Sequence, residues 1–133
     1  MKWGENMAEE KNFEDKIKAW FHKVGIYPAG MGVQDMKVAQ VGWYTKIWGG
    51  GFQKAGIPDI ICCINGLFVA VEVKATRGRP TTLQSINCNR IRDSGGQACV
   101  LYPSGFERFQ KDVEFIIRQG RVLKDMNLQS QYK

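Results

Sequence analysis

Apolar residues recur along the first part of the chain at intervals of three and four positions. This spacing places them on one stripe of an α-helix, and we predict a helix over residues 9–24 that is ended by Gly25. The residues of the stripe are Phe13, Ile17, Trp20, Phe21 and Val24.

Two further helices are indicated by capping signals. Thr81 and Gln84 have the spacing of a capping box and begin a predicted helix that continues to Asp93. Ser104 and Glu107 repeat this spacing and predict a helix of similar length that ends near residue 119.

Between the helices the pattern is typical of strands. Residues 41–48 are rich in aromatic and β-branched side chains, and 98–102 form a shorter apolar run. The runs 59–64 and 67–74 flank Asn65-Gly66, a pair that favours a two-residue hairpin turn. Both hairpin strands are apolar on both faces, which predicts a place in the middle of a covered sheet.

The predicted order is helix, three strands, helix, strand, helix. We therefore expect the α/β class, with a mixed central sheet flanked by helices and the last strand parallel to the second hairpin strand. A length of 133 residues suits one domain over 1–133. Its core is expected over about 9–119, with a short strand and a polar tail over 121–133.

The excess of basic residues indicates which class of molecule the protein binds. Lys and Arg outnumber Asp and Glu by 19 to 13, which gives a net charge of +6 and favours nucleic acids ahead of membranes. No apolar run approaches the roughly 18 residues of a membrane-spanning helix, and the first residues do not resemble a secretory signal. We expect a cytoplasmic protein without membrane contact.

Cysteine and histidine usage excludes several chemistries. The four cysteines contain no Cys-x-x-Cys pair, so a disulfide scaffold or structural zinc site is not expected, and we interpret them as reduced, mostly buried residues. His22 is the only histidine and falls within a predicted helix. Any catalysis should therefore depend on carboxylates and lysine.

The hairpin register brings such residues together. Pairing about Asn65-Gly66 places Asp59 opposite Glu72, on one face of the sheet. Lys74 follows Glu72 by two positions and points to the same face. We expect these three side chains at the open end of the hairpin.

Two neighbouring carboxylates repel each other unless a cation lies between them. Mg²⁺ or Mn²⁺ suits such oxygen ligands, and it can polarise a phosphoryl oxygen and lower the pKa of a bound water. Lys74 could orient that water or neutralise charge on the phosphate. The alternative is a surface salt-bridge cluster at the strand ends, and spacing alone does not decide between the two.

A family resemblance favours the metal site. Pro58-Asp59 followed by Glu72-Val73-Lys74 resembles the PD-(D/E)xK nuclease signature. The resemblance is closest to small stand-alone phage members of the virus-type replication-repair nuclease (VRR-NUC) family, and it covers roughly residues 13–109. The segments that carry it are Gly56-Ile57-Pro58-Asp59, Glu72-Val73-Lys74, Gln84 and Gly95-Gly96.

The resemblance implies a restriction-endonuclease-like αβββαβ core and a set of site residues. Asp59, Glu72 and the backbone carbonyl of Val73 would bind Mg²⁺, with Mn²⁺ as a substitute, and Lys74 would be the catalytic lysine. Gln84 matches a glutamine on the helix after the catalytic strand; its alternative role is the capping box.

Members of the family also carry a glutamate on the first helix. Glu14 matches it best and would be a further catalytic residue and candidate metal ligand, while Glu10, one turn earlier, is the second choice. Either residue could instead be a favourable charge near the start of a helix.

Basic residues follow the catalytic strand, and two lysines lie in a stretch before it that contains no acidic residue. They could bind phosphates or simply be solvated. The predicted DNA contacts are Lys46, Lys54, Arg77, Arg79 and Arg90. Tyr44, Trp48 and Phe52 are interleaved with the lysines, a mixture that suits stacking on unpaired bases. Trp43 or Trp48 could equally be a core residue or a dimer contact.

These observations lead us to expect a divalent-metal-dependent DNA endonuclease acting on branched DNA, such as a Holliday junction or a flap. Symmetric junction cleavage would require a homodimer. Three alternatives remain: a nuclease of ordinary duplex or single strands, a non-catalytic DNA-binding module, and an RNase H-like resolvase. The last fits poorly because a two-residue turn closes the Asp-to-Glu hairpin, which also carries a lysine on the same face.

Overall fold

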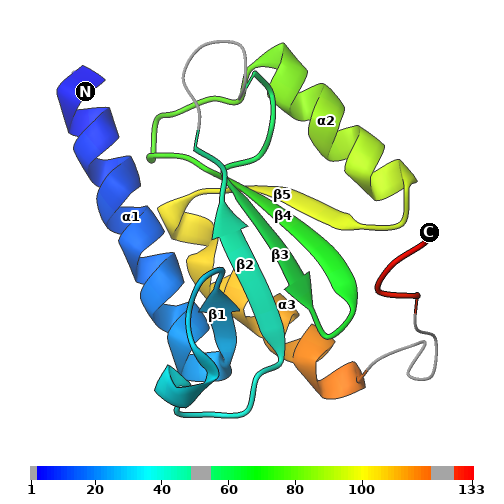
Figure 1. Ribbon diagram of the computed structural model, residues 1–133. Helices are drawn as coiled ribbons and strands as arrows, with labels where there is room; N and C mark the ends of the chain where they lie inside the picture. The colour runs from blue at the N-terminus through cyan, green and yellow to red at the C-terminus, as the bar shows by residue number, and fades with distance from the viewer. Residues whose placement is uncertain (1–2, 49–54, 121–127) are drawn as a thin grey trace.

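The computed structural model describes residues 3–48, 55–120 and 128–133. Its regular elements form a five-stranded sheet with three α-helices (Figure 1). In chain order they are α1 (Trp3–Val24), β1 (Ile26–Pro28), η1 (Val33–Asp35), β2 (Gly42–Lys46), β3 (Ile60–Ile64), β4 (Leu67–Val73), α2 (Thr82–Asp93), β5 (Gln97–Leu101), η3 (Pro103–Gly105) and α3 (Phe106–Gln119).

The sheet has the order β1-β2-β3-β4-β5 and is mixed. Strands β2, β3 and β4 run antiparallel, whereas β1 is parallel to β2 and β5 is parallel to β4. The predicted α/β class and the parallel placement of the last strand are therefore confirmed. Strand β1 was not predicted, because three residues that end in Pro28 give no alternating pattern.

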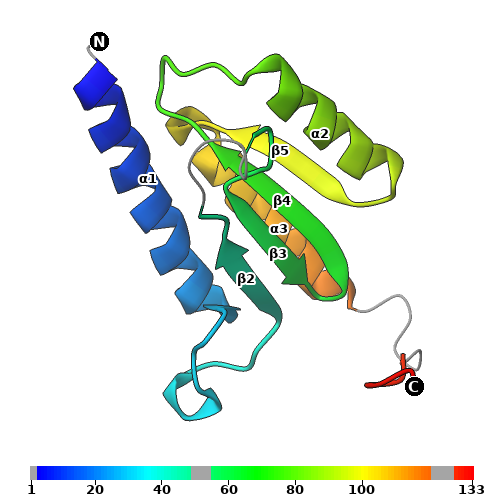
Figure 2. The same cartoon turned by 45° about the horizontal axis from the view of Figure 1, so that its top comes forward.

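Helices α1 and α3 cover one face of the sheet, and α2 lies on the other. Phe21 of α1 and Phe109 of α3 share a core with Val71 of β4. Figure 2 shows α3 passing behind β3 and β4, with α1 beside β2. Cys88 of α2 packs with Ala70, the neighbour of Val71 that points to the opposite face.

The β3–β4 hairpin has the predicted register. Ile64 pairs with Leu67 beside the turn, and Ile60 pairs with Val71. Asn65 adopts a φ of 53°, as a type I′ turn requires. Its side-chain amide also donates to the carbonyl oxygens of Ile116 and Ile117, both at 3.2 Å, and thereby satisfies carbonyls in the last turn of α3.

Several predicted details are wrong. Helix α1 begins six residues before the predicted start, at Trp3. Ser104 does not cap α3, because residues 103–105 form the 3₁₀ turn η3 and Gly105 takes the N-cap position without a side-chain hydrogen bond.

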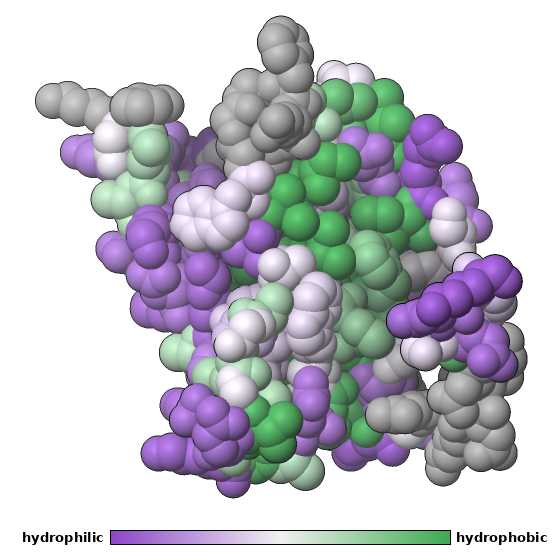
Figure 3. Space-filling model, viewed as in Figure 1, coloured by the Kyte–Doolittle hydropathy of each residue, from purple (hydrophilic) through white to green (hydrophobic). Residues whose placement is uncertain are grey.

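The hairpin is covered less completely than predicted. β4 is buried from Val69 to Val73, but Cys63 is exposed and Phe68 is 42% exposed on the α2 side. Figure 3 shows hydrophobic residues at the surface between the strands and α2. Helix α2 packs on β5 and leaves this part of the sheet open.

All four cysteines are free thiols, as expected. Burial raises the pKa of Cys62 to about 12 and that of Cys99 to about 11, so both thiols are neutral near pH 7. Among the described residues, no helix combines the length and apolarity that crossing a membrane requires. Residues 128–133 form no helix or strand, and residues 121–127, the rest of the segment predicted to hold a short strand and a polar tail, lie outside the described residues.

Candidate active site

The open end of the β3–β4 hairpin concentrates buried charge. Within the described ranges, the buried charged residues are Glu14, Asp59 and Glu72, which are 4%, 4% and 2% exposed. Glu72 lies in β4, and Asp59 directly precedes β3. Isolated buried carboxylates are unfavourable, so each one requires specific partners.

Asp59 is fixed to both neighbouring strands. Its Oδ2 accepts a 2.7 Å hydrogen bond from the backbone N of Val73, the residue after Glu72. Its own carbonyl accepts a 2.7 Å hydrogen bond from the backbone N of Ile47 at the end of β2. The first of these bonds holds the Asp59 carboxylate against the strand that carries Glu72.

The segment just before Asp59 packs closely against α2 at Gly56. Gly56 has a φ of +74°, and a Cβ atom there would lie 2.4 Å from Cγ of Leu83. The Gly56 carbonyl accepts a 2.8 Å hydrogen bond from the Asn87 side chain. Only glycine fits this position, which explains the glycine two residues before Pro58.

Glu72 is held from two directions. Its Oε1 lies 3.7 Å from Nζ of Lys74 and accepts a 2.9 Å hydrogen bond from Nε2 of Gln84. Gln84 also completes a capping box, since its Oε1 accepts from the Thr81 backbone N and its own N donates to Thr81 Oγ1. The capping interpretation of Gln84 is therefore confirmed, and the same side chain also contacts Glu72.

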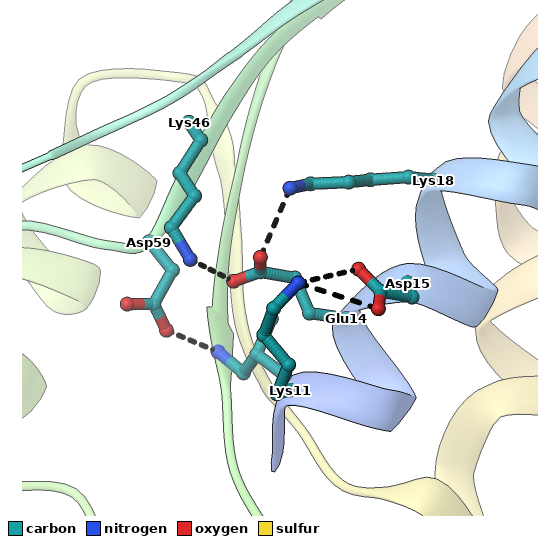
Figure 4. A network of polar contacts seen from close by, with 7 residues as sticks. Lys11, Glu14, Asp15, Lys18, Lys46 and Asp59 are labelled. Atoms are coloured by element: carbon teal, nitrogen blue, oxygen red, sulfur yellow. Dashed lines mark hydrogen bonds and ion pairs between the residues drawn. The ribbon is translucent and has the colours of Figure 1, made fainter. Parts of the chain in front are cut away.

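Glu14 reaches the same end of the sheet from α1. Figure 4 shows its carboxylate between Lys18 and Lys46, on the side of Asp59 that faces α1. Oε2 lies 3.0 Å from Nζ of Lys18, and Oε1 pairs with Nζ of Lys46. The second choice, Glu10, is partly buried one turn earlier. Glu14 thus links α1 to β2 through Lys46, whereas its pair with Lys18 lies within α1.

The loop after β4 presents Arg77 and Arg79, both exposed, and is fixed at two points. The Thr76 backbone N donates to Oε1 of Glu9, and hydrogen bonds from the Thr76 side chain and backbone lower the pKa of the Glu9 carboxyl. The Tyr102 hydroxyl donates to the Gly78 carbonyl at 2.9 Å. Residues 76–79 and Tyr102 line a hollow of about 550 Å³.

The other predicted DNA contacts lie elsewhere or outside the described residues. Arg90 lies six positions after Gln84 on α2, about 9 Å farther along the helix axis. It lines a mainly apolar pocket of about 370 Å³ with Phe68 and Ile91. Lys54 and Phe52 lie outside the described residues.

The donor set at the open end suits a hard divalent cation. Asp59 and Glu72 offer carboxylate oxygens, which Mg²⁺ and Mn²⁺ prefer, and neither histidine nor cysteine belongs to the set. In the part of the chain that the structure describes, no three His, Cys, Asp or Glu side chains form a metal-binding group. A site here would use the carboxylates of Asp59 and Glu72, with water or main-chain oxygen as further ligands.

Sequence reasoning missed the residues that hold the site in place. Hydrogen-bonding side chains on separate elements give no local pattern, so only their positions in the fold identify them. They are Glu9, Lys18, Asn87 and Tyr102. Lys18 alone had a usable signal, because it follows Glu14 by four positions on a helix.

Comparison of the chain with known protein families, with curated proteins and with solved structures gave no match.

Proposed function

We propose that the protein is a divalent-metal-dependent DNA endonuclease that hydrolyses phosphodiester bonds, with a preference for branched DNA such as a Holliday junction or a flap. The observation that carries the proposal is the pair of buried carboxylates, Asp59 and Glu72, at one end of a hairpin beside Lys74. A purely structural hairpin has no need for two buried acids and a lysine at this position.

Asp59 and Glu72 would hold Mg²⁺ or Mn²⁺, with the Val73 carbonyl as a further ligand. When bound, the ion would polarise the scissile phosphate and lower the pKa of a water molecule. Gln84 keeps Glu72 oriented through the 2.9 Å hydrogen bond. The ammonium of Lys74 would orient the attacking water or neutralise charge that develops on the phosphate.

The basic surface next to these residues would bind the DNA backbone. Arg77 and Arg79 lie on the loop that follows β4 and Lys74, and both side chains are exposed. The contacts of Glu9 and Tyr102 limit the movement of this loop, so less freedom is lost when it binds phosphate.

The preference for branched DNA rests on the resemblance to the VRR-NUC branch of the PD-(D/E)xK nucleases, in particular to small stand-alone phage types. Cleavage of two opposed strands of a junction needs two sites, so the proposal includes a homodimer. The same site could instead cut ordinary duplex or single-stranded DNA.

A catalytically idle DNA-binding module of the same fold is the principal alternative from another class. It would need the basic residues but would gain nothing from Asp59 and Glu72, since buried acids weaken binding to a polyanion. The carboxylates therefore favour the enzyme.

The test is cleavage of a labelled four-way junction beside a linear duplex of matched sequence, with Mg²⁺ or with EDTA, by the wild type and by Lys74→Ala. We expect cutting of the junction that requires both Mg²⁺ and Lys74. Equal cutting of both substrates would leave a nuclease but reject the junction preference. Binding without cutting under any divalent metal would reject the enzyme.

A further inference from the structure

The end of β2 lies beside Asp59 and carries two side chains with unusual surroundings, Lys46 and Trp48. Lys46 pairs in register with Ile60, the residue after Asp59. The backbone N of Ile47, between Lys46 and Trp48, donates to the Asp59 carbonyl. The backbone that carries both side chains is therefore fixed to the residue that would ligate the metal.

Lys46 is held in place by a buried acid. Its ammonium pairs with Glu14, and its side chain is only 20% exposed (Figure 4). Lys18 contacts the second oxygen of the same carboxylate. Glu14 is thus shared by two ammonium groups and cannot neutralise both, so Lys46 can still contact an anion such as a phosphate.

Trp48 differs sharply from the other aromatic residue interleaved in this segment. Tyr44 is 5% exposed and packs against Phe21 in the core, whereas Trp48 is 80% exposed. Nζ of Lys46 lies 4.9 Å from the centroid of the Trp48 ring, a cation–π distance that orients the ring beside the ammonium. The interpretation of Trp48 as a core residue is therefore wrong.

A large, flat aromatic ring beside a fixed cation matches the two parts of a nucleotide, a base and a phosphate. A base within continuous duplex has both faces stacked on its neighbours and cannot stack on a side chain. An unpaired base can, and such stacking contributes about 1–3 kcal/mol.

We propose that Lys46 and Trp48 bind one unpaired nucleotide of the substrate next to the cleaved bond, with Lys46 on a phosphate and Trp48 stacked on the base. Glu14 acts as a positioning residue for Lys46. The inference rests on the proposed function and narrows it, since the preferred substrate then contains unpaired bases near the cut, as flaps, gaps and opened junctions do.

The test compares a fluorescently labelled oligothymidylate with a labelled abasic strand of the same length, both in EDTA so that no cutting occurs. Dissociation constants come from fluorescence anisotropy. We expect Trp48→Ala to weaken oligothymidylate binding about tenfold and to change abasic binding by less than about twofold. Lys46→Ala should weaken both, and Trp48→Phe should retain most of the affinity.

Trp43→Ala is the matched control, because Trp43 lies on the same strand and is 42% exposed. It should leave both affinities unchanged. The inference is overturned if Trp48→Ala weakens the two strands equally or neither of them, or if it changes only the oligomeric state, which would make Trp48 a contact with a second copy. If the wild type cleaves DNA while Trp48→Ala has no selective effect, only this inference fails. If the wild type binds no DNA, the proposed function fails as well.

Discussion

The two ends of the β3–β4 hairpin are built in opposite ways. At the turn end, Ile64 pairs with Leu67, and the Asn65 side chain donates to two carbonyls of α3. At the open end, Asp59 and Glu72 are buried carboxylates that accept hydrogen bonds from β4 and α2, and the Asp59 backbone carbonyl accepts one from Ile47, next to β2.

At the turn end, the polar groups are satisfied by neutral hydrogen bonds. This arrangement is sufficient for a stable hairpin. The open end accumulates buried charge, which opposes folding unless it is compensated. A chain retains such an arrangement when the charge has a task, so the difference between the two ends indicates which one performs chemistry.

The largest effect should follow removal of charge at the open end. We expect Glu72→Gln to lower Mg²⁺-dependent cleavage about a thousandfold while DNA binding persists, because the amide cannot replace the carboxylate as a metal ligand. Single-turnover rates with saturating DNA measure this change. Glu114→Gln, on the exposed surface of α3, should cut like the wild type. If Glu72→Gln turns over normally, Glu72 has no part in catalysis.

A backbone change at the open end should reduce stability. Gly56→Ala introduces a Cβ atom 2.4 Å from Cγ of Leu83 at a φ of +74°, so we expect the free energy of unfolding to fall by about 3 kcal/mol. In Gly95→Ala the φ of +93° has a similar cost but the Cβ has open space, and a loss of about 1 kcal/mol should result. Urea denaturation compares the two, and equal losses would mean that contact with α2 is unimportant.

A change at the turn end should affect stability without affecting cleavage. Asn65→Gly keeps the positive φ but removes both hydrogen bonds to α3, so we expect a loss of about 1 kcal/mol in unfolding free energy. Asn65→Ala adds the cost of a left-handed conformation, about 1 kcal/mol more. A marked loss of cleavage in folded Asn65→Gly would contradict the division between the two ends.

The smallest effect should separate the two roles of Gln84. Thr81→Ala removes only the capping side chain and should lower unfolding free energy by about 1 kcal/mol with little change in cleavage. Gln84→Ala also removes the contact with Glu72 and should slow cleavage about tenfold in addition. Equal cleavage rates for these two variants would reduce Gln84 to a helix cap.

The sequence predicted best those features that depend on neighbouring residues. Asn65-Gly66 determined the hairpin register, which is observed as far as Ile60 and Val71, and Thr81 with Gln84 marked the start of α2. The short strand β1 escaped prediction because three residues carry no periodicity. The prediction that Ser104 caps the last helix was wrong because residues 103–105 form a 3₁₀ turn before α3 begins.

Contacts between distant elements could not be predicted. Glu14 and Lys46 are 32 positions apart, and nothing local indicates that they pair. The contrast between buried Tyr44 and exposed Trp48 likewise depends on where β2 ends relative to α1. Alternation within a strand indicates opposite faces, but only the packed helices decide which face is covered.

The proposed chemistry depends most directly on whether the carboxylates at the open end bind a divalent cation. Calorimetric titration of Mn²⁺ into the full chain, without DNA, tests this independently of activity. We predict saturable binding by the wild type and by Glu107→Gln, which removes a charge from the exposed surface of α3, and none by Asp59→Asn or Glu72→Gln. Unchanged Mn²⁺ affinity in both site variants would contradict the account.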